Sequence, residues 1–174
     1  MNELTFRTAT FKDLATIVAI YNESIPGRLA TADTEPLTVA ARQPWFTAHQ
    51  QSHQGIWVAV LANKIVGWFS FSDFYGRPAY KQTKEISIYL TAAVQHQHLG
   101  QKVLTFAETK ARQLGLETIV AFIFKHNQPS VHLFKKNHYQ IWGDLPDVAI
   151  MDQKHYSLLI LGKQLTPSVV GGNS

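Results

Sequence analysis

The sequence contains no cysteine, and this absence removes several kinds of chemistry. Disulfide bonds, thiolate metal sites and cysteine nucleophiles all need the thiol group. No apolar run approaches the ~20 residues that a helix needs to cross a bilayer, and the first residues lack the basic and apolar segments of a secretory signal. We therefore expect a cytoplasmic protein that makes no contact with a membrane.

Charged side chains are also scarce, at 16% of the residues, and the net charge of +4 is scattered along the chain. A positive net charge favours an anionic partner. No basic stripe accompanies the aromatic residues Trp57, Trp68 and Phe69, which fall inside apolar runs and are typical of a core. We expect no nucleic-acid partner, and a phosphorylated small molecule fits the charge better.

The length of 174 residues and the 45% hydrophobic content predict one globular domain with a substantial core. We expect this domain to span residues 1–165. The last residues, 166–174, are rich in Ser, Gly and Val after a proline, which predicts a flexible tail. The chain has no internal repeat and no linker.

Hydrophobic periodicity predicts short strands interrupted by helices. The expected strands are residues 4–7, 56–61, 65–72, 84–90, 118–124, 139–142 and 151–161, with a turn over 143–147 before the last. The expected helices are one that begins near Leu14 with Asp13 as its cap, one over 38–51, one over 99–114 that ends at Gly115, and one that begins near Pro129. The order β-α-α-β-β-β-α-β-α-β-β predicts an α/β fold of the mixed type, with helices on the faces of a mixed sheet.

The segment Gln95-His96-Gln97-His98-Leu99-Gly100 separates an apolar strand from the longest predicted helix. A helix that opens directly after a strand presents unpaired backbone N–H groups and the positive end of its dipole, which together bind anions. The alternative is a plain polar turn. His96 and His98 alone supply too few ligands for a metal, so we expect none.

The element order, this loop, and the segment Asn127-Gln128-Pro129-Ser130 at the head of the next helix resemble the GNAT superfamily of acetyl-CoA-dependent N-acetyltransferases. Within it, FYGRPAY at 74–80 followed by EISIYL at 85–90 resembles the phosphinothricin and methionine sulfoximine acetyltransferase group. The likeness covers residues 4–165. It implies a mostly antiparallel sheet with splayed central strands, helices on both faces, acetyl-CoA as cosubstrate, a small-molecule amine as acceptor, and a possible homodimer.

The resemblance also implies where the cosubstrate binds. The implied contacts are the backbone of Ile88, Tyr89 and Leu90 on a strand that bulges and splays, the loop and helix start Gln95, His96, Gln97, His98, Leu99, Gly100 and Gln101, and then Asn127 and Ser130. His98 departs from the pattern because the family usually has a glycine there, where backbone approaches a ligand or takes positive φ. For Asn127 and Ser130 the alternative is helix capping, and for the strand it is a buried ladder.

Glu85 is the candidate general base. An amine is mostly ammonium at neutral pH, so a base must expose its lone pair before it attacks a thioester. A carboxylate among Ile86, Ile88 and Leu90 on a central strand is expected to have a raised pKa because it is desolvated. The resembling group has its proposed base at this position. The alternative is a glutamate paired with Lys84 or Arg77 in solvent.

The acceptor site is expected around Arg77, which can hold a carboxylate bidentately and so suits an amino acid-like amine. The resemblance adds Tyr75, Gly76, Glu85, Ile86 and Ser87 to its lining. Many relatives place a tyrosine near Phe134 as the acid for the departing thiolate, so that role is unfilled or passes to Tyr139, Tyr89 or water.

We therefore expect direct acetyl transfer to a small amino acid such as phosphinothricin or methionine sulfoximine. Two alternatives stay open at this point. One keeps the chemistry with a polyamine, an aminoglycoside or a protein N-terminus as acceptor. The other is a regulator that binds acyl-CoA without turnover. The sequence leaves the acyl-chain length and the oligomeric state undetermined.

Overall fold

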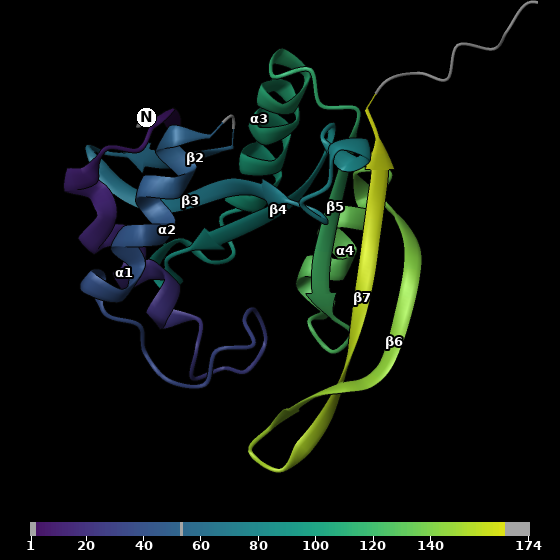
Figure 1. The fold of residues 1–174 in the computed structure, drawn as a ribbon. Coiled ribbons are helices and arrows are strands. Elements are labelled where there is room, and N and C mark those ends of the chain that lie inside the picture. Colours follow the sequence, from purple (N-terminus) through teal and green to yellow (C-terminus); the bar gives the residue numbers. More distant parts are fainter. Residues whose placement is uncertain (1–2, 53, 166–174) are drawn as a thin grey trace, which may run out of the picture.

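The computed structural model describes residues 3–52 and 54–165, and Figure 1 gives its ribbon. The expected tail at 166–174 lies outside the described residues. No helix within the described ranges is both long enough and apolar enough to span a bilayer.

Seven strands form one sheet in the order β1-β2-β3-β4-β5-β7-β6. Every neighbouring pair is antiparallel except β4 and β5, which are parallel. The strands are β1 Thr5–Thr8, β2 Gly55–Leu61, β3 Lys64–Asp73, β4 Thr83–Leu90, β5 Thr118–Phe124, β6 Gln140–Met151 and β7 Lys154–Gln164. The helices are α1 Leu14–Glu23, α2 Val39–Gln51, α3 Leu99–Gln113 and α4 Gln128–Lys136. The mixed, mostly antiparallel α/β fold and the predicted element order are confirmed.

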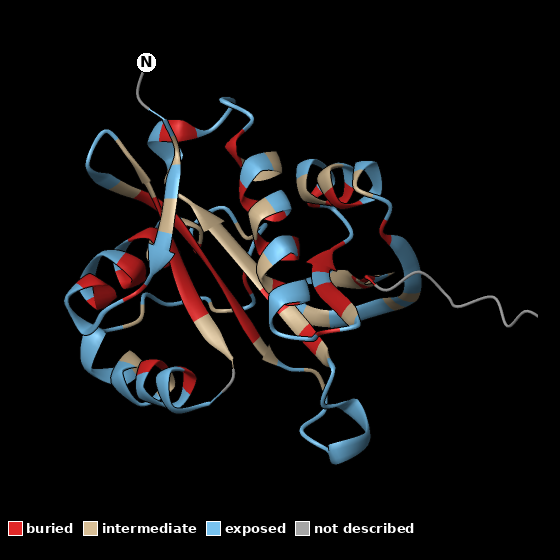
Figure 2. Cartoon of the chain, turned by 90° about the horizontal axis from the view of Figure 1, so that it is seen from above, coloured by how far each residue is buried: buried red, intermediate tan, exposed pale blue. Residues whose placement is uncertain are grey.

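The helices cover both faces of the sheet, as expected, and each face has its own core (Figure 1). On one face α1 and α2 bury Phe46 against Val58 and Trp68. On the other face, the apolar stripe of α3 that includes Val103 and Ala107 packs with residues of α4 and the strands. In Figure 2 the buried residues gather where the helices meet the sheet. Each fully buried large side chain contributes about 1.5–3 kcal/mol, so these two layers fix the strands between them.

β4 and β5 pair over only part of their length, which splits the sheet (Figure 1). Thr83–Glu85 pair with Thr118–Val120, and beyond that point the two strands are no longer partners. β4 stays bound to β3, while β5 stays bound to β7. The expected splay is thus confirmed. The expected bulge in β4 is wrong, because β4 pairs with β3 in unbroken register from Lys84 to Leu90 and the two strands part without one.

The last hairpin differs from the prediction. β6 continues through residues 143–147, and the turn lies at Asp152 and Gln153, whose φ values of +50° and +65° suit a two-residue hairpin turn. The turn-forming residues at 143–147 instead accompany a register shift between Leu145 and Ala149, where Asp147 has a φ of +53°. A β-bulge and a turn favour the same residue types, which explains the error.

Asp13 does not cap α1 with its side chain as expected. Its carboxylate instead accepts the backbone N–H of Thr10 at 2.8 Å, at the start of the short 3-10 turn Phe11–Asp13. It also accepts two guanidinium hydrogen bonds from Arg7, at 2.7 and 2.9 Å. Arg7 of β1 is charged and binds the carboxylate more strongly than the helix N–H groups would. This bond lowers the pKa of Asp13 to about 2.

Candidate active site

The parted strands leave backbone groups of β4 facing the gap. The N–H of Thr91 donates to the carbonyl of Val66 on β3 at 2.8 Å. Because successive residues of a strand point their backbone groups to opposite sides, Tyr89 then faces β3, and Ile88 and Leu90 face the gap. Two of the three expected backbone contacts are therefore exposed to a ligand in the gap. Tyr89 belongs to the ladder, which corrects its assignment as a backbone donor.

The predicted anion loop opens α3 beside the parted end of β4. His96 and His98 both have positive φ, of +68° and +55°, and His98 is the left-handed residue immediately before the helix. The position where a glycine is usual thus does take the conformation that favours glycine. The side chains of residues 95–98 are exposed, and the first N–H groups of α3 have no partner inside the helix. This geometry is typical of a helix N-terminus that binds an anion.

The first turn of α3 lies tightly against α4. A side chain on Gly100 would bring its Cβ within 3.2 Å of Leu133 Cδ2, so glycine lets the two helices approach. The amide of Gln101 exchanges two hydrogen bonds with that of Asn137, at 2.6 and 2.8 Å. The Gln101 side chain is thus engaged within the protein, and only its main chain is available to a phosphate.

Asn127 serves as the cap of α4, which is the alternative the sequence left open. Its Oδ1 accepts the N–H of Ser130, and its Nδ2 donates to the carbonyl of Leu29 at 3.2 Å. His126 Nε2 donates to the neighbouring Arg28 carbonyl at 2.7 Å. Asn127 is buried, and its polar groups join the α1–α2 loop to the end of β5.

Glu85 lies at the last paired position of β4, where the strands begin to part. It is half-buried, and desolvation raises the pKa of its carboxyl, as the sequence predicts. The alternative pairing is absent from the described residues, because Lys84 forms its ion pair with Asp73 across the ladder and Glu85 has no ion pair. The pKa of the Asp73 carboxyl falls through this bond from Lys84. Within the described ranges Glu85 is thus left without a cation to neutralise it, which is compatible with the predicted role as a general base.

His49 is a buried histidine near Glu85. The sequence did not predict it as part of the site. His49 of α2 donates from Nδ1 to the carbonyl of Trp45 at 2.9 Å, and its Nε2 therefore accepts the hydroxyl of Ser72 at 3.1 Å. Burial lowers the pKa of His49, which favours this neutral ring. Ser72 is the cross-strand partner of Glu85. The His49–Ser72 pair therefore holds α2 against β3, the strand next to the one that carries Glu85.

The predicted acceptor loop leads from β3 into β4 and is exposed over Tyr75–Tyr80. Gly76 has a φ of +68° at its tip, and Arg77 follows it. Phe74, at its start, stacks on Phe122 of β5, with ring centres 6.4 Å apart. The loop therefore reaches from β3 to β5, where Phe122 lies just beyond the residues that pair with β4.

Ile86 cannot line the acceptor site with its side chain, although the sequence reading placed it there. Side chains alternate along a strand, so Ile86 faces away from Glu85 and Ser87. It is 4% exposed and lies in the core beneath α3. Glu85, Ser87 and Tyr89 share the face that carries α1 and α2, and an acceptor that meets Glu85 must lie on that face.

Burial narrows the choice among the residues predicted to donate a proton to the departing thiolate. Phe134 is buried with its ring edge-on to Tyr139 and has no proton to donate. Tyr139 is sealed in the core, where burial and Glu108 of α3 raise the pKa of its phenol. Tyr89 lies on the acceptor face, and its hydroxyl donates to the Ala30 carbonyl at 3.4 Å. Burial raises the pKa of the Tyr89 phenol as well, but Tyr89 is only half-buried, so Tyr89 and water remain as predictions for this role and Tyr139 does not.

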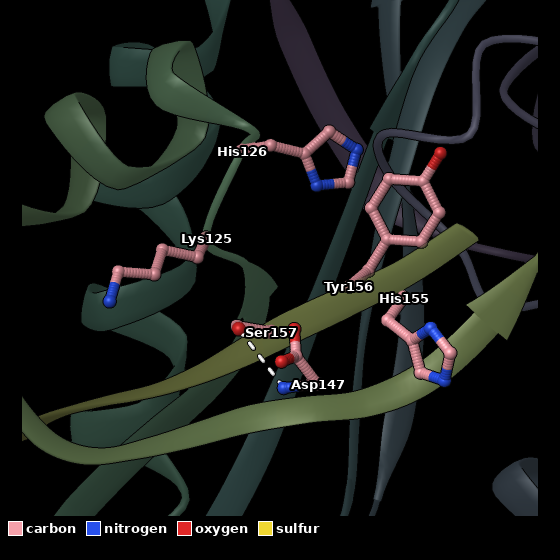
Figure 3. A pocket seen from close by; sticks show the side chains of 6 residues that line it. All are labelled: Lys125, His126, Asp147, His155, Tyr156 and Ser157. Atoms are coloured by element: carbon pink, nitrogen blue, oxygen red, sulfur yellow. Dashed lines mark hydrogen bonds between the residues drawn. The ribbon is translucent and has the colours of Figure 1, made fainter.

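A shallow pocket of about 260 Å³ lies beyond the end of β5, beside the β6–β7 hairpin (Figure 3). It is lined by Lys125, His126, Asp147, His155, Tyr156 and Ser157. The rings of His126 and Tyr156 have their centres 4.6 Å apart. Because the His126 ring also donates to the Arg28 carbonyl, the pocket lies beside the α1–α2 loop.

Comparisons with known proteins were made for the family, the sequence and the fold. Residues 16–139 match the model of the acetyltransferase (GNAT) family. YwnH of Bacillus subtilis, whose name assigns it provisionally to the phosphinothricin acetyltransferases, is 44% identical over 94% of this chain and 100% of its own. The L-methionine sulfoximine/L-methionine sulfone acetyltransferase of Pseudomonas paraeruginosa is 29% identical over 93% of this chain and 95% of its own.

A solved structure adds a relative with a ligand. The protein yncA of Salmonella typhimurium, which is described provisionally as an acetyltransferase with its cofactor acetyl-CoA, matches with a TM-score of 0.88 at 26% identity, over 95% of this chain and 96% of that one.

Proposed function

The chain belongs to the acetyltransferase (GNAT) family, and we propose that it transfers the acetyl group of acetyl-CoA directly to the primary amine of a small amino acid-like acceptor. The observation that carries the proposal is the gap between β4 and β5, which opens beside the unpaired start of α3 and has Glu85 at its closed end.

The site fits acetyl-CoA on the structure's own geometry. The left-handed turn at His98 aims the first N–H groups of α3 out of the helix, where they suit a pyrophosphate. The gap takes the extended pantetheine arm, with Ile88 and Leu90 offering it backbone groups. When bound, acetyl-CoA supplies an acetyl thioester that an amine can attack. The backbone N–H groups that face the gap then stabilise the negative charge that develops on the carbonyl oxygen.

Glu85 removes the proton from the acceptor's ammonium group, directly or through one water. Its raised pKa suits this step, because a base works best when its pKa approaches the working pH. No covalent enzyme intermediate is needed, since a neutral amine held close to a thioester already reacts in one displacement. Ser87, two residues further on the same face, lines the path of the amine.

Arg77 holds the acceptor's carboxylate with its fork of N–H donors. Tyr75 and Gly76 of the same loop, together with Ser87, form the neighbouring wall. Support for an amino acid-like acceptor comes from the relatives named for phosphinothricin and for methionine sulfoximine. A polyamine or an aminoglycoside has no carboxylate for Arg77 to bind.

We test the proposal by the release of free CoA thiol across a panel of amines. Phosphinothricin, methionine sulfoximine and methionine sulfone are expected to be turned over, while spermidine and kanamycin are not. Turnover of the polyamine or the aminoglycoside alone would favour the alternative acceptor classes. Binding of acetyl-CoA without thiol release for any amine would favour the non-catalytic reading.

We also propose that the enzyme works in the cytoplasm as a homodimer. The support for a dimer is a set of large apolar side chains left exposed on β6, namely Ile141, Trp142, Val148 and Ile150. Contiguous exposed apolar surface is typical of an interface. The support for the cytoplasm is the cosubstrate, which is made and used inside cells. Light scattering on the purified protein tests the dimer, and a single-chain mass would contradict it.

A further inference from the structure

Arg42 of α2 lies over aromatic rings and has no acidic partner. Its Cζ is 3.9 Å from the centre of the Trp45 ring and 5.6 Å from that of Tyr21. The residue is half-buried, and burial lowers the pKa of its guanidinium, which nevertheless stays charged. Within the described ranges no carboxylate lies within 4.0 Å of this guanidinium. The carboxylate that influences it most, Asp33, accepts the hydroxyl of Tyr21 instead.

The hydrogen-bonding groups and the charge of this guanidinium are only partly satisfied within the protein. The guanidinium has five N–H donors, and a half-buried charge that has lost part of its hydration needs an opposite charge or hydrogen bonds in return. Stacking on Trp45 compensates for only part of this, and it leaves the edge of the planar fork open. That edge matches two oxygen atoms of an oxyanion. The arrangement therefore suits an anionic ligand.

Arg42 lies on the same side of the sheet as Glu85. Tyr89 shares the face of Glu85 on β4, and the rings of Tyr89 and Tyr21 have their centres 4.9 Å apart. Arg42 lies over this Tyr21 ring. The predicted pyrophosphate seat at the start of α3 belongs to the opposite face, so an anion that meets Arg42 comes with the acceptor.

The two arginines flank the base along β4. Arg77 lies in the turn that precedes the strand, Glu85 follows near its start, and Arg42 lies over the cluster that covers its far end. We propose that Arg42 binds a second acidic group at the side-chain end of the acceptor, so that the enzyme prefers amino acids that carry a tetrahedral oxyanion there to their neutral isosteres. This inference rests on the proposed acetyltransferase function and specifies its substrate class.

Phosphinothricin and methionine sulfone form a matched pair of acceptors for the test. Both are amino acids with a methyl group and two oxygen atoms on a tetrahedral centre at the end of the side chain, and only the phosphinate is charged. The wild type should have the higher kcat/KM for phosphinothricin. Arg42→Met, which keeps an apolar side chain over Trp45, should lower that value on the order of 10- to 100-fold, mainly through KM. The value for methionine sulfone should change by less than about threefold, because no charged hydrogen bond is lost there.

Two further variants complete the comparison. Arg42→Lys should recover part of the preference, because it keeps the charge and loses the fork. Arg112→Met makes the same exchange on the opposite face, where Arg112 lies 3.6 Å from Glu108 on α3, and should leave both acceptors unaffected. The melting temperature and the Kd for acetyl-CoA are measured for every variant.

Three results would overturn the inference. Unchanged kcat/KM values for both acceptors in Arg42→Met would show that no acidic group meets Arg42. An equal loss on both acceptors would assign Arg42 to packing, and a weaker Kd for acetyl-CoA would assign it to the cosubstrate. Absence of thiol release from the wild type with either acceptor would instead be a failure of the proposed function, visible before any variant is compared.

Discussion

The joined and parted ends of β4 and β5 belong to the same two strands, yet they do different work. At the joined end, Thr83–Glu85 pair with Thr118–Val120, and the ion pair of Lys84 and Asp73 adds to the ladder. At the parted end, the same backbone leaves hydrogen-bonding groups toward a gap. Unpaired strand groups usually invite aggregation, and they are kept where a ligand uses them. The paired end thus holds β4 and β5 together, and the parted end leaves backbone groups free to bind a ligand.

The strongest test of this contrast removes the base at the boundary between the two ends. Glu85→Gln should lower kcat on the order of 10²- to 10⁴-fold, because the neutral amide cannot accept a proton from the amine. The Kd for acetyl-CoA should stay nearly unchanged. Steady-state kinetics and calorimetry measure the two quantities.

The pH dependence gives a second readout of the same variant. Glu85 works when ionised, so the wild-type rate should rise with pH through a pKa above the ordinary glutamate value. A carboxyl whose pKa is raised by folding stabilises the protein only below that pKa, so Glu85→Gln should not lower the melting temperature at neutral pH. An equal rate and an unchanged pH profile would remove Glu85 from the mechanism.

Proline substitutions sharpen the contrast between the two edges of β4. The N–H of Ile88 faces the gap, so Ile88→Pro should keep the ladder to β3 and cost about 1–3 kcal/mol through lost packing. It should lower kcat on the order of 10²- to 10³-fold, since a donor to the reacting carbonyl is lost.

The matched variant is Tyr89→Pro, which removes a ladder hydrogen bond and a ring that packs on Tyr21. It should destabilise the fold by more than about 3 kcal/mol. Denaturant unfolding and thiol release are measured for both variants. Equal loss of stability in the two would contradict the alternation of the strand derived from Thr91 and Val66.

A change far from the gap should affect stability alone. Asp13→Asn weakens the bonds from Arg7 and Thr10 and should lower the free energy of unfolding by about 1–2 kcal/mol at pH 7, with kcat unchanged. Because folding lowers the pKa of Asp13 to about 2, this stabilisation is present above the unfolded value near 4 and is lost as the pH falls toward 2. Urea unfolding across that range checks it, and a wild type and variant that differ equally at pH 7 and pH 2 would refute it.

The smallest effect is expected at the start of α3. His98 has a left-handed backbone, so His98→Gly should raise the free energy of unfolding by up to about 1 kcal/mol. The Kd for acetyl-CoA should change by less than about threefold, since the backbone donors stay in place. His132→Gly, in the interior of α4, is the control and should lower stability by about 1 kcal/mol. A loss of stability in both would mean that the His98 ring stabilises the loop.

Local patterns explain what the sequence could predict of the fold. The strand over 118–124 and the helix over 38–51, whose Thr38 accepts the N–H of Ala41, are found as predicted because periodicity and capping are local properties. The final hairpin was misplaced because a bulge and a turn use the same residues. Asp13 was misplaced because its partner Arg7 comes from another element.

The site divides in the same way. The roles of Glu85 and of the loop before α3 are predicted from their immediate neighbours in sequence, and they stay predictions. Ile86 was misassigned, although alternation along the strand alone places it opposite Glu85. Arg42 and His49 could not be found, because their importance depends on which strands α2 covers.

The most direct test of the central claim is a crystal structure of the protein with acetyl-CoA. The account predicts the pyrophosphate within hydrogen-bond distance of the main-chain N–H groups at the start of α3, after His98. It also predicts the thioester between β4 and β5, with its carbonyl oxygen toward Ile88 or Leu90. A cosubstrate bound outside this gap, or a pyrophosphate held elsewhere on the surface, would contradict the account.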